Sequence, residues 1–273
     1  MHSMYNCIPK KFLMPIEDIE KGLEVIKNIG YYKQTGRPPI NAEIVLQALY
    51  YLVRTGMQWQ ALPLCFGPSS TVHAAFQRFN DLGFFDNYWL EGLEEYDKER
   101  GLDLAKKVGD CVHIKSPLGT DAVGPSPVDR SKQGTKRSII TDGNGILLGC
   151  VIAAGNRNDA KLLDATLASI PTQYQSKGGD QLWLDAIYDT KEVNTICLMH
   201  NIRPQISPKP CKKRIEPVRP IQTGVRWVVE RTHSWINRFR RLFIRYDKFA
   251  ENHVAFIKFA AASHLFARLR VSG

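Results

Sequence analysis

The sequence predicts an α/β fold: a mixed sheet flanked by helices, preceded by an N-terminal all-helical region that resembles a helix-turn-helix. Apolar residues recur at helical spacing through the first hundred residues, and beyond about residue 107 strand-like segments alternate with helical ones. The segment Asp142–Gly145, Asp-Gly-Asn-Gly between two apolar runs, is a strong hairpin signal. We therefore expect a helical domain at 1–100 and an α/β domain at 101–273.

Two helical patterns dominate the N-terminal region, at residues 40–56 and 67–83. The second begins with a serine cap candidate, and its expected apolar face is Val72, Ala75, Phe76 and Phe79. The polar positions on its other faces include His73, Gln77 and Arg78. A helix, a connection with Gly and Pro, and a polar second helix fit a helix-turn-helix, with residues 70–82 as the DNA-groove helix. A plain helical bundle gives the same pattern.

The second region alternates strands and helices. We expect a strand at 107–115, a hairpin at 136–155 and a helix at 158–171. The elements expected after these are a short strand in 180–189, a helix at 190–201, an extended segment at 202–207, a Pro- and Lys-rich loop at 208–224, a long helix at 225–243 and a closing helix at 251–270.

The chain is basic. Its 37 Lys and Arg outnumber 27 Asp and Glu, which gives a net charge of +10. This excess favours a polyanion partner, nucleic acid first and an anionic membrane surface second, although a basic protein without such a partner is an equal alternative. The six cysteines form no CxxC pair, which is typical of reduced cytosolic proteins. No segment has the apolar character of a signal peptide or a membrane span, so we expect a cytoplasmic, nucleoid-associated protein without membrane contact.

Three acids stand in unusual surroundings. Asp110 lies in the first strand, Asp185 follows an apolar strand, and Glu230 lies in a helix among arginines. Buried strands seldom keep an Asp unless it is paired or binds a metal, and sites in α/β sheets gather at the carboxyl ends of strands. Together the three carboxylates suit a pair of hard cations such as Mg²⁺. Taken singly, the acids are better explained as a turn cap, a loop-entry Asp and a helix salt bridge with Arg226, and the metal interpretation gains when the three are taken together.

Helical geometry divides the long helix into two sides. Its polar side carries Arg226, Glu230, His233, Asn237 and Arg241, and its expected buried side carries Val228, Trp235, Phe239 and Leu242. From residue 203 to 248 there are thirteen Lys and Arg but three acids, which favours a phosphate-bearing ligand. His233 is expected either to orient a ligand, to contact DNA or to be a satisfied helix histidine. Trp227 and Trp235 are expected in the core.

Several blocks of the sequence resemble DDE transposases of bacterial insertion sequences, in the group usually numbered five. The blocks are "DRSKQGTKRSIITDGNGILLG", "GNRNDAKLLD", "WLDAIYD" and "RWVVERTHSWINRFRRLFIRYDK", and "GRPPINAEIVLQALYYLVRTGMQWQALP" resembles the group's N-terminal domain. The resemblance covers about residues 12–270.

The resemblance implies an RNase H-like catalytic domain that binds two Mg²⁺ ions, with Mn²⁺ as a substitute. It implies cleavage of element ends and transfer of the freed 3′-hydroxyls into target DNA. Asp110, Asp185 and Glu230 match the catalytic and metal-binding triad, and Arg226 matches the basic residue four positions before the Glu. The implied partners are double-stranded DNA, as terminal inverted repeats and target, and a second copy of the chain.

The implied DNA contacts are spread over three segments. They are Arg130, Lys132 and Lys136 before and within the hairpin, Arg226, Arg231, Arg238 and Arg241 in the long helix, and His73, Gln77 and Arg78 in the N-terminal region. Asp159 is expected to cap a helix.

Two positions depart from the family's pattern. Asn237 stands where relatives have Lys, and Ala186-Ile187 stands where many have Lys-Gly. These departures leave two alternatives: a decayed copy that only binds DNA, and a Mg²⁺-dependent nuclease.

Overall fold

The computed structural model describes residues 5–32, 38–127, 129–206 and 227–271. It divides into two units. The first contains residues 1–99, 236–244 and 251–273, and the second contains residues 100–235 and 245–250. The predicted range 101–273 is thus shared between the units, because C-terminal helices pack with N-terminal ones, as set out below.

The second unit is built on one mixed sheet. Along the sheet its main strands are β4 (Leu147–Ala154), β3 (Gln133–Asp142), β1 (Lys106–Lys115), β5 (Gln181–Leu184) and β6 (Arg203–Ile206). β3 is antiparallel to β1 and β4, whereas β5 is parallel to β1 and β6 to β5. The short β2 (Gly124–Pro125) also pairs with β3. This order, with its single antiparallel strand in the β3 position, is that of the RNase H-like fold and confirms the predicted class.

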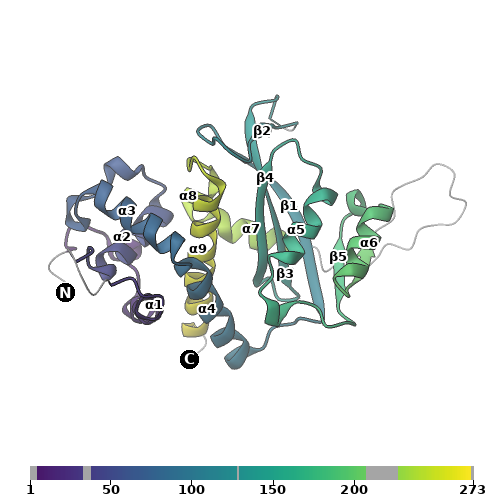
Figure 1. Cartoon of the computed structure of the whole chain (residues 1–273), viewed down its shortest axis with the longest axis horizontal. Helices are drawn as coiled ribbons and strands as arrows, with labels where there is room; N and C mark the ends of the chain where they lie inside the picture. The colour runs from purple at the N-terminus through teal and green to yellow at the C-terminus, as the bar shows by residue number, and fades with distance from the viewer. Residues whose placement is uncertain (1–4, 33–37, 128, 207–226, 272–273) are drawn as a thin grey trace, which may run out of the picture. The chain divides into compact units, whose positions relative to one another are not determined.

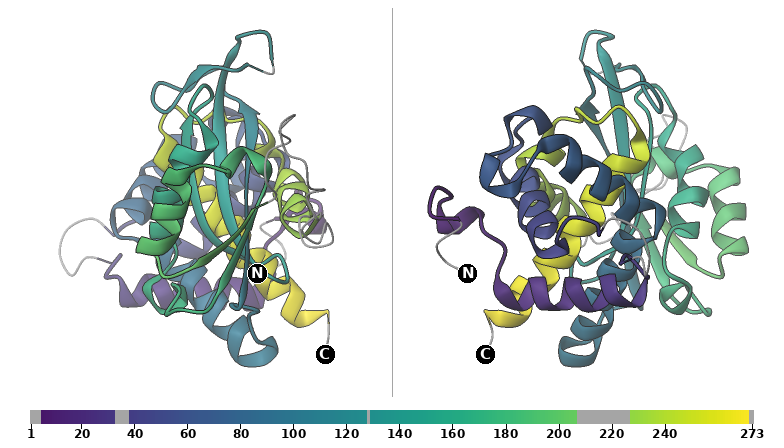
Figure 2. Two further views of the ribbon diagram at one scale, coloured as in Figure 1. Left: turned by 90° about the vertical axis from the view of Figure 1, so that its right-hand side faces the viewer. Right: turned by 60° about the vertical axis from the view of Figure 1, so that its left-hand side comes forward.

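Helices cover both faces of this sheet (Figures 1 and 2). On one face the Ser138 hydroxyl of β3 lies 2.8 Å from that of Thr166 in α5 (Leu163–Ala168). Its neighbour in β3, Arg137, faces the other way and contacts His233 of α7 (Trp227–Asn237) at 3.2 Å. Because successive side chains of a strand point to opposite faces, α5 and α7 lie on opposite sides of β3. The helix α6 (Lys191–Met199) connects β5 to β6.

The β3–β4 turn holds α7 in place. The Asp142 carboxylate accepts hydrogen bonds from the backbone N–H groups of Asn144 and Ile146, at 2.9 and 2.7 Å, which fixes the turn. The carbonyl of Gly145 then accepts from the Thr232 hydroxyl at 2.8 Å, and that of Asn144 accepts from Arg231 at 2.8 Å. The hairpin predicted from the sequence therefore also sets the position of the helix that carries Glu230.

A buried arginine fixes the segment that follows α8. Arg245 is fully buried, and its guanidinium donates to five oxygens. These are the backbone carbonyls of Asp247, Ala122 and Lys248, the Thr135 hydroxyl and the Asp121 carboxylate. Because every donor has an acceptor, the cost of burying this charge is offset within the unit.

The first unit is helical. Its helices are α1 (Ile16–Asn28), α2 (Ala42–Thr55), α3 (Ser69–Asp81), α4 (Phe84–Arg100), α8 (Arg240–Phe243) and α9 (Ala250–Arg270). Short 3-10 turns lie at Lys10–Phe12, Trp59–Ala61 and Leu64–Phe66; those of the second unit lie at Asp159–Leu162, Thr172–Tyr174 and Ala186–Tyr188.

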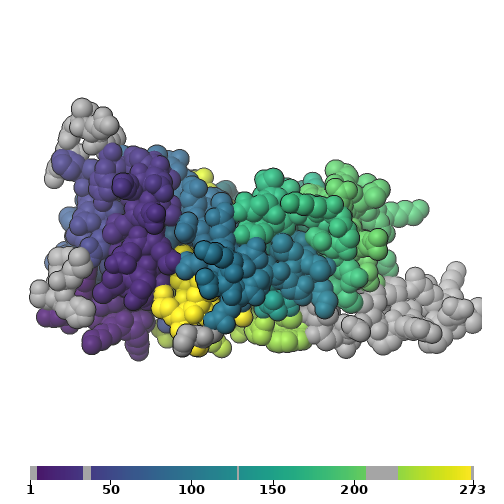
Figure 3. Space-filling view, turned by 90° about the horizontal axis from the view of Figure 1, so that it is seen from below, coloured from purple at the N-terminus to yellow at the C-terminus, as the bar shows by residue number. Residues whose placement is uncertain are grey.

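Aromatic contacts join α9 to the N-terminal helices. Phe256 of α9 stacks on Phe76 of α3 with ring centroids 4.8 Å apart, and Tyr88 of α4 lies 5.7 and 5.4 Å from Phe259 and Phe266. Arg270 at the end of α9 also pairs with the buried Asp18 of α1. Figure 3 shows the result, with C-terminal residues in yellow at the surface beside the N-terminal ones in purple.

Two predicted helical features differ in the structure. The helix expected at 225–243 breaks at Phe239, whose extended backbone separates α7 from α8. This break lets Phe239, Arg241 and Leu242 turn into the first unit, where all three are buried. The expected serine cap of α3 is also wrong, since Pro68 precedes the helix and no side chain caps it.

The connection between α2 and α3 is longer than a helix-turn-helix usually has. It spans residues 56–68 and contains two 3-10 turns, whereas a helix-turn-helix has a turn of about three or four residues. The predicted apolar face of α3 is confirmed, since Val72, Ala75, Phe76 and Phe79 are all buried. In the part of the chain that the structure describes, no helix has the length and apolar character needed to cross a bilayer.

Substituting Gly145 tests the contact between the turn and α7. We expect Gly145→Ala to lower the free energy of unfolding for two reasons. Its φ of 82° strains any L-residue by about 1–2 kcal/mol, and its Cβ would stand 3.1 Å from Thr232 Oγ1 and 3.2 Å from Val228 Cγ1.

The matched control is Gly101→Ala, where φ is 75° but no atom lies within 4 Å of the added Cβ. Urea denaturation should therefore show a larger loss for Gly145→Ala, by about 1 kcal/mol or more. Equal losses for the two variants would contradict the proposed contact.

Candidate active site

Asp110 lies in the middle of β1, and Asp185 comes directly after β5, the strand that runs parallel to β1. The pairing of β1 with β5 sets Lys106 opposite Gln181 and Val108 opposite Trp183. Continuing this register by two residues sets Asp185, the residue directly after β5, opposite Asp110. In-register residues of neighbouring strands point to the same face, so both carboxylates leave the sheet on the same side.

α7 lies over that face. Asp110 pairs with Ile139 of β3, and Arg137, two residues away, points to the same side as Asp110. His233 of α7 contacts both: its Nδ1 is 3.2 Å from Arg137 Nη2, and its Nε2 is 3.8 Å from Asp110 Oδ2. The helix is thereby fixed directly above the first acid.

Glu230 lies one helical turn before His233. It is exposed, whereas Val229, Thr232 and His233 face the sheet and are buried. Residues three apart in a helix share a side, so Glu230 is directed to the region occupied by Asp110 and His233. The three predicted acids therefore lie on β1, directly after β5, and on α7, the helix that contacts Asp110 through His233.

His233 is uncharged in this setting. Burial, with the positive charge of Arg137 as the second cause, lowers its pKa from 6.5 to about 3. Burial also lowers the pKa of Arg137 itself to about 10, so the guanidinium keeps its charge at neutral pH. His233 does not belong to the exposed basic stripe expected from the helical pattern: it is buried, and among the described residues its Nε2 has no hydrogen-bond partner.

The donor set suits a hard divalent cation. Carboxylate oxygens are the ligands that Mg²⁺ and Mn²⁺ prefer, and Asp110, Asp185 and Glu230 would supply three carboxylates. As placed, the side chains within the described ranges form no cluster of three His, Cys, Asp or Glu residues able to hold an ion. One oxygen of Asp185 instead accepts the Ile187 N–H at 2.8 Å and caps the 3-10 turn that follows. The site therefore suits a divalent cation by the β1–β5 register and by the chemistry of its carboxylates, and not by the present side-chain positions.

Some of the predicted DNA contacts are exposed. Arg130 and Lys132 lie on a surface loop between β2 and β3, and Arg231 and Arg238 are exposed. Arg231 also lies 4.4 Å above the ring of Trp227. Trp227 is about half exposed (51%), so its predicted place in the core is wrong. Arg226 lies outside the described residues, as does the whole Pro- and Lys-rich loop at 208–224.

Other predicted contacts are engaged within the protein. Lys136 is buried, pairs with Asp159 and donates to the Arg157 carbonyl at 2.7 Å. Arg241 is buried in the first unit, donates to the Met57 carbonyl and lies 4.6 Å from the Phe256 ring centroid. The structure therefore corrects the surface role expected for these two cations.

The predicted residues of α3 are half-buried. Arg78 donates to the Tyr31 carbonyl and lies 4.9 Å from the centroid of its ring. His73 packs edge-on against Trp59 and lies 3.5 Å from Gln77. Contacts of these three side chains with DNA stay a prediction.

Two further sequence expectations are resolved locally. Asn158, not Asp159, caps the helical turn after β4, through its bond from the Ala160 N–H at 2.9 Å. Ala186 and Ile187 form a 3-10 turn without positive φ, so this chain does not need the glycine that many relatives have there.

Arg137 is the site residue that sequence reasoning missed. The sequence feature that could have identified it is the position of this charged residue within a predicted strand, just before the apolar run in "KRSIIT". Such a residue is seldom buried unless it is paired.

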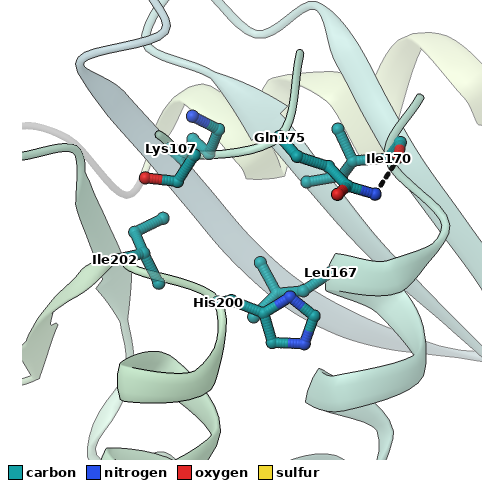
Figure 4. A pocket seen from close by; sticks show the side chains of 7 residues that line it. Lys107, Leu167, Ile170, Gln175, His200 and Ile202 are labelled. Atoms are coloured by element: carbon teal, nitrogen blue, oxygen red, sulfur yellow. Dashed lines mark hydrogen bonds between the residues drawn. The ribbon is translucent and has the colours of Figure 1, made fainter. Parts of the chain in front are cut away.

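A small pocket lies at the opposite end of the parallel strands (Figure 4). It is lined by Lys107, Leu167, Ile170, Gln175, Ser176, His200 and Ile202. Lys107 is buried and pairs with Asp180 at 2.6 Å, and His200 pairs with Asp164 at 2.8 Å. These polar groups are satisfied within the unit and lie at the amino ends of β1 and β5, so they are better explained as packing.

Two family descriptions match the sequence. "Transposase DDE domain" matches residues 116–265, a range that contains Asp185 and Glu230 but begins after Asp110. "Putative transposase of IS4/5 family" matches residues 23–89. The putative transposase for insertion sequence element IS402 of Burkholderia cepacia is 34% identical over 145 residues. That match covers 51% of this chain and 66%, just under two thirds, of the relative.

Similar solved structures include two complexes of the Mos1 transposase. The paired-end complex with left transposon end is 13% identical, with 76% of this chain and 80% of that chain covered and a TM-score of 0.28. The Mos1 mariner paired end complex with Mn is 14% identical, with 88% and 87% covered and a TM-score of 0.28. Similarity at this level adds nothing to the fold established by the strand order.

The lowered pKa of His233 predicts a pH-dependent stability. Below pH 6.5 the unfolded chain protonates this ring, whereas the folded chain does not until about pH 3. His233 therefore leaves the free energy of unfolding unchanged above pH 6.5 and lowers it by about 1.4 kcal/mol per pH unit between those values.

The measurement is urea denaturation at pH 7.5 and pH 5. The wild type should lose about 2 kcal/mol more than His233→Gln over this interval, since the variant lacks the titrating ring. A loss of equal size in both proteins would contradict the buried, neutral state of His233.

Proposed function

The chain belongs to the DDE transposases, and from that premise we propose that it cuts DNA at the ends of a mobile element and transfers the freed 3′-hydroxyls into target DNA. The observation that carries the proposal is the β1–β5 register, by which Asp110 and Asp185 leave neighbouring strands on the face covered by the helix of Glu230. A set of three carboxylates on one face of a sheet is suited to phosphodiester chemistry with divalent cations.

Asp110, Asp185 and Glu230 would hold the cations, Mg²⁺ or Mn²⁺ in its place. When bound, the ions supply activation of the attacking oxygen and stabilisation of the leaving oxygen. The chain's own contribution is to set three carboxylates at fixed backbone positions, so that little reorganisation is needed during the reaction. Neither a serine nor a cysteine nucleophile is required, because water and then the DNA 3′-hydroxyl attack phosphorus.

Exposed cations near these acids support DNA as the substrate. Arg231 lies next to Glu230 on α7, and Arg238 follows that helix. Arg130 and Lys132 add charge on the loop between β2 and β3, and the whole chain carries +10. Positive side chains contact backbone phosphates and set the orientation of the duplex. We assign the N-terminal unit, through α3, to the terminal repeats, and expect two copies to hold two element ends.

The test uses purified full-length protein, Mg²⁺ and DNA that carries the element ends. We expect Glu230→Gln to reduce cleavage and strand transfer by at least 1,000-fold, because it removes one anionic ligand at nearly constant shape. DNA affinity should change by less than threefold. Asp189→Asn is the matched control, a nearby carboxylate outside the triad, and it should keep nearly full activity.

Each result decides between functions. Strand transfer by the wild type supports a transposase, cleavage without transfer supports a nuclease, and binding alone supports a decayed copy. Full activity of Glu230→Gln, or loss of its DNA binding with the fold intact, would contradict the catalytic role of this acid.

A further inference from the structure

Arg137, His233 and Asp110 form a buried series of contacts beneath the proposed site. Arg137 is fully buried and His233 is 6% exposed, so both side chains lie away from the surface. The distances are 3.2 Å from Arg137 Nη2 to His233 Nδ1 and 3.8 Å from His233 Nε2 to Asp110 Oδ2. The three residues come from β3, α7 and β1, so the series ties the helix to two strands of the sheet.

We propose that Arg137 holds His233 in its Nε2–H tautomer, and that this N–H positions the Asp110 carboxylate to bind a catalytic cation. This inference rests on the proposed function, since it assigns Asp110 as a metal ligand. His233 and Arg137 are positioning residues: neither has to touch the DNA or the ion.

The tautomer follows from hydrogen-bond chemistry. A guanidinium has only donors, so the His233 Nδ1 that faces it has to be the acceptor. In a neutral imidazole the remaining proton then lies on Nε2, which is the nitrogen that faces Asp110. A proton on Nδ1 would set two donors against each other in a buried site, which costs about 1–3 kcal/mol.

The Nε2–H of His233 can orient the Asp110 carboxylate. Ligating carboxylates are commonly held by hydrogen bonds from neighbouring residues, which fix the direction of the remaining oxygen. At 3.8 Å the contact with Oδ2 is longer than a hydrogen bond, and such contacts in active sites often tighten when the reaction complex forms. A bond to Oδ2 would leave Oδ1 for the ion.

The first test measures the tautomer in the wild-type protein without metal. Long-range ¹H–¹⁵N correlation spectra of protein labelled in its histidine rings report which ring nitrogen is protonated. The signals of His233 are identified by their loss in His233→Gln. We expect a single Nε2–H tautomer at pH 7. An Nδ1–H tautomer, or averaged signals of both forms, would overturn the proposal whatever the variants do.

The second test separates the two nitrogens by substitution. Gln places an amide nitrogen near the Nε2 position and keeps a donor toward Asp110, whereas Asn keeps a polar group near Nδ1 and lacks that donor. The affinity for Mn²⁺, followed by electron paramagnetic resonance, should fall 10- to 100-fold in His233→Asn and by less than threefold in His233→Gln. Both variants lose part of the contacts among Arg137, His233 and Asp110. A loss of stability alone would therefore lower the affinity for Mn²⁺ equally in the two variants.

The outcomes distinguish this inference from the proposed function. A wild-type protein that binds no Mn²⁺ would overturn the metal-dependent function. A wild type that binds Mn²⁺ as tightly as His233→Asn does would overturn the positioning role and leave the function in place. Rescue by His233→Gln, with its strand-transfer rate near that of the wild type, supports the positioning role.

Discussion

The site depends on the register between β1 and β5. Val108 lies opposite Trp183, and the same register continued by two residues sets Asp110 opposite Asp185. A slip of one residue would turn every side chain of a strand to its other face, and the two carboxylates would then leave opposite sides of the sheet. The apolar residues guard against such a slip, because Leu182 and Leu184 are buried on the face opposite the acids.

The pairing of β3 with β1 also places a buried charged group, Arg137, next to the strand of Asp110. The positive charge of Arg137 lies on the acid-bearing face of β3, one strand away from Asp110. A lone buried guanidinium would cost several kcal/mol, but here it meets the His233 imidazole as an acceptor. The burial that makes this arrangement costly also keeps His233 neutral, so the helix above the sheet adds no second positive charge at the acids. A neutral ring next to Asp110 leaves that carboxylate available to a cation.

Strands, hairpin and class could be predicted from the sequence because they depend on local patterns. The alternation around Asp110, the Asp-Gly-Asn-Gly turn and the spacing of apolar residues in α3 each reflect a short segment, and each is confirmed. The three candidate acids can also be identified from the sequence, and their assignment as metal ligands stays a prediction.

The mistakes share one cause, which is tertiary contact. Helical periodicity continues through Phe239, yet the chain leaves the helix there so that Phe239 can pack under Arg54, whose guanidinium lies 5.3 Å from the ring centroid. Lys136 and Arg241 have the composition of surface cations but find buried carboxylate, carbonyl and aromatic partners far away in the sequence. Trp227 has the composition of a core residue but is exposed under Arg231. No local pattern contains the distant partners of Phe239, Lys136 and Arg241.

β3 holds the chain at both points where it passes between the two units. The chain leaves the second unit after Trp235 and re-enters it at Arg245, and both crossings are tied to the same strand. Arg137 holds α7 just before the first crossing, and the Thr135 hydroxyl accepts from Arg245 at the second. Residues two apart in a strand point to the same face, so both ties lie on the side that carries Asp110. The segment 236–244 can therefore pack into the first unit while the helix of Glu230 stays fixed over the sheet. In physical terms, one strand keeps the third acid in place although the chain around it belongs to two units.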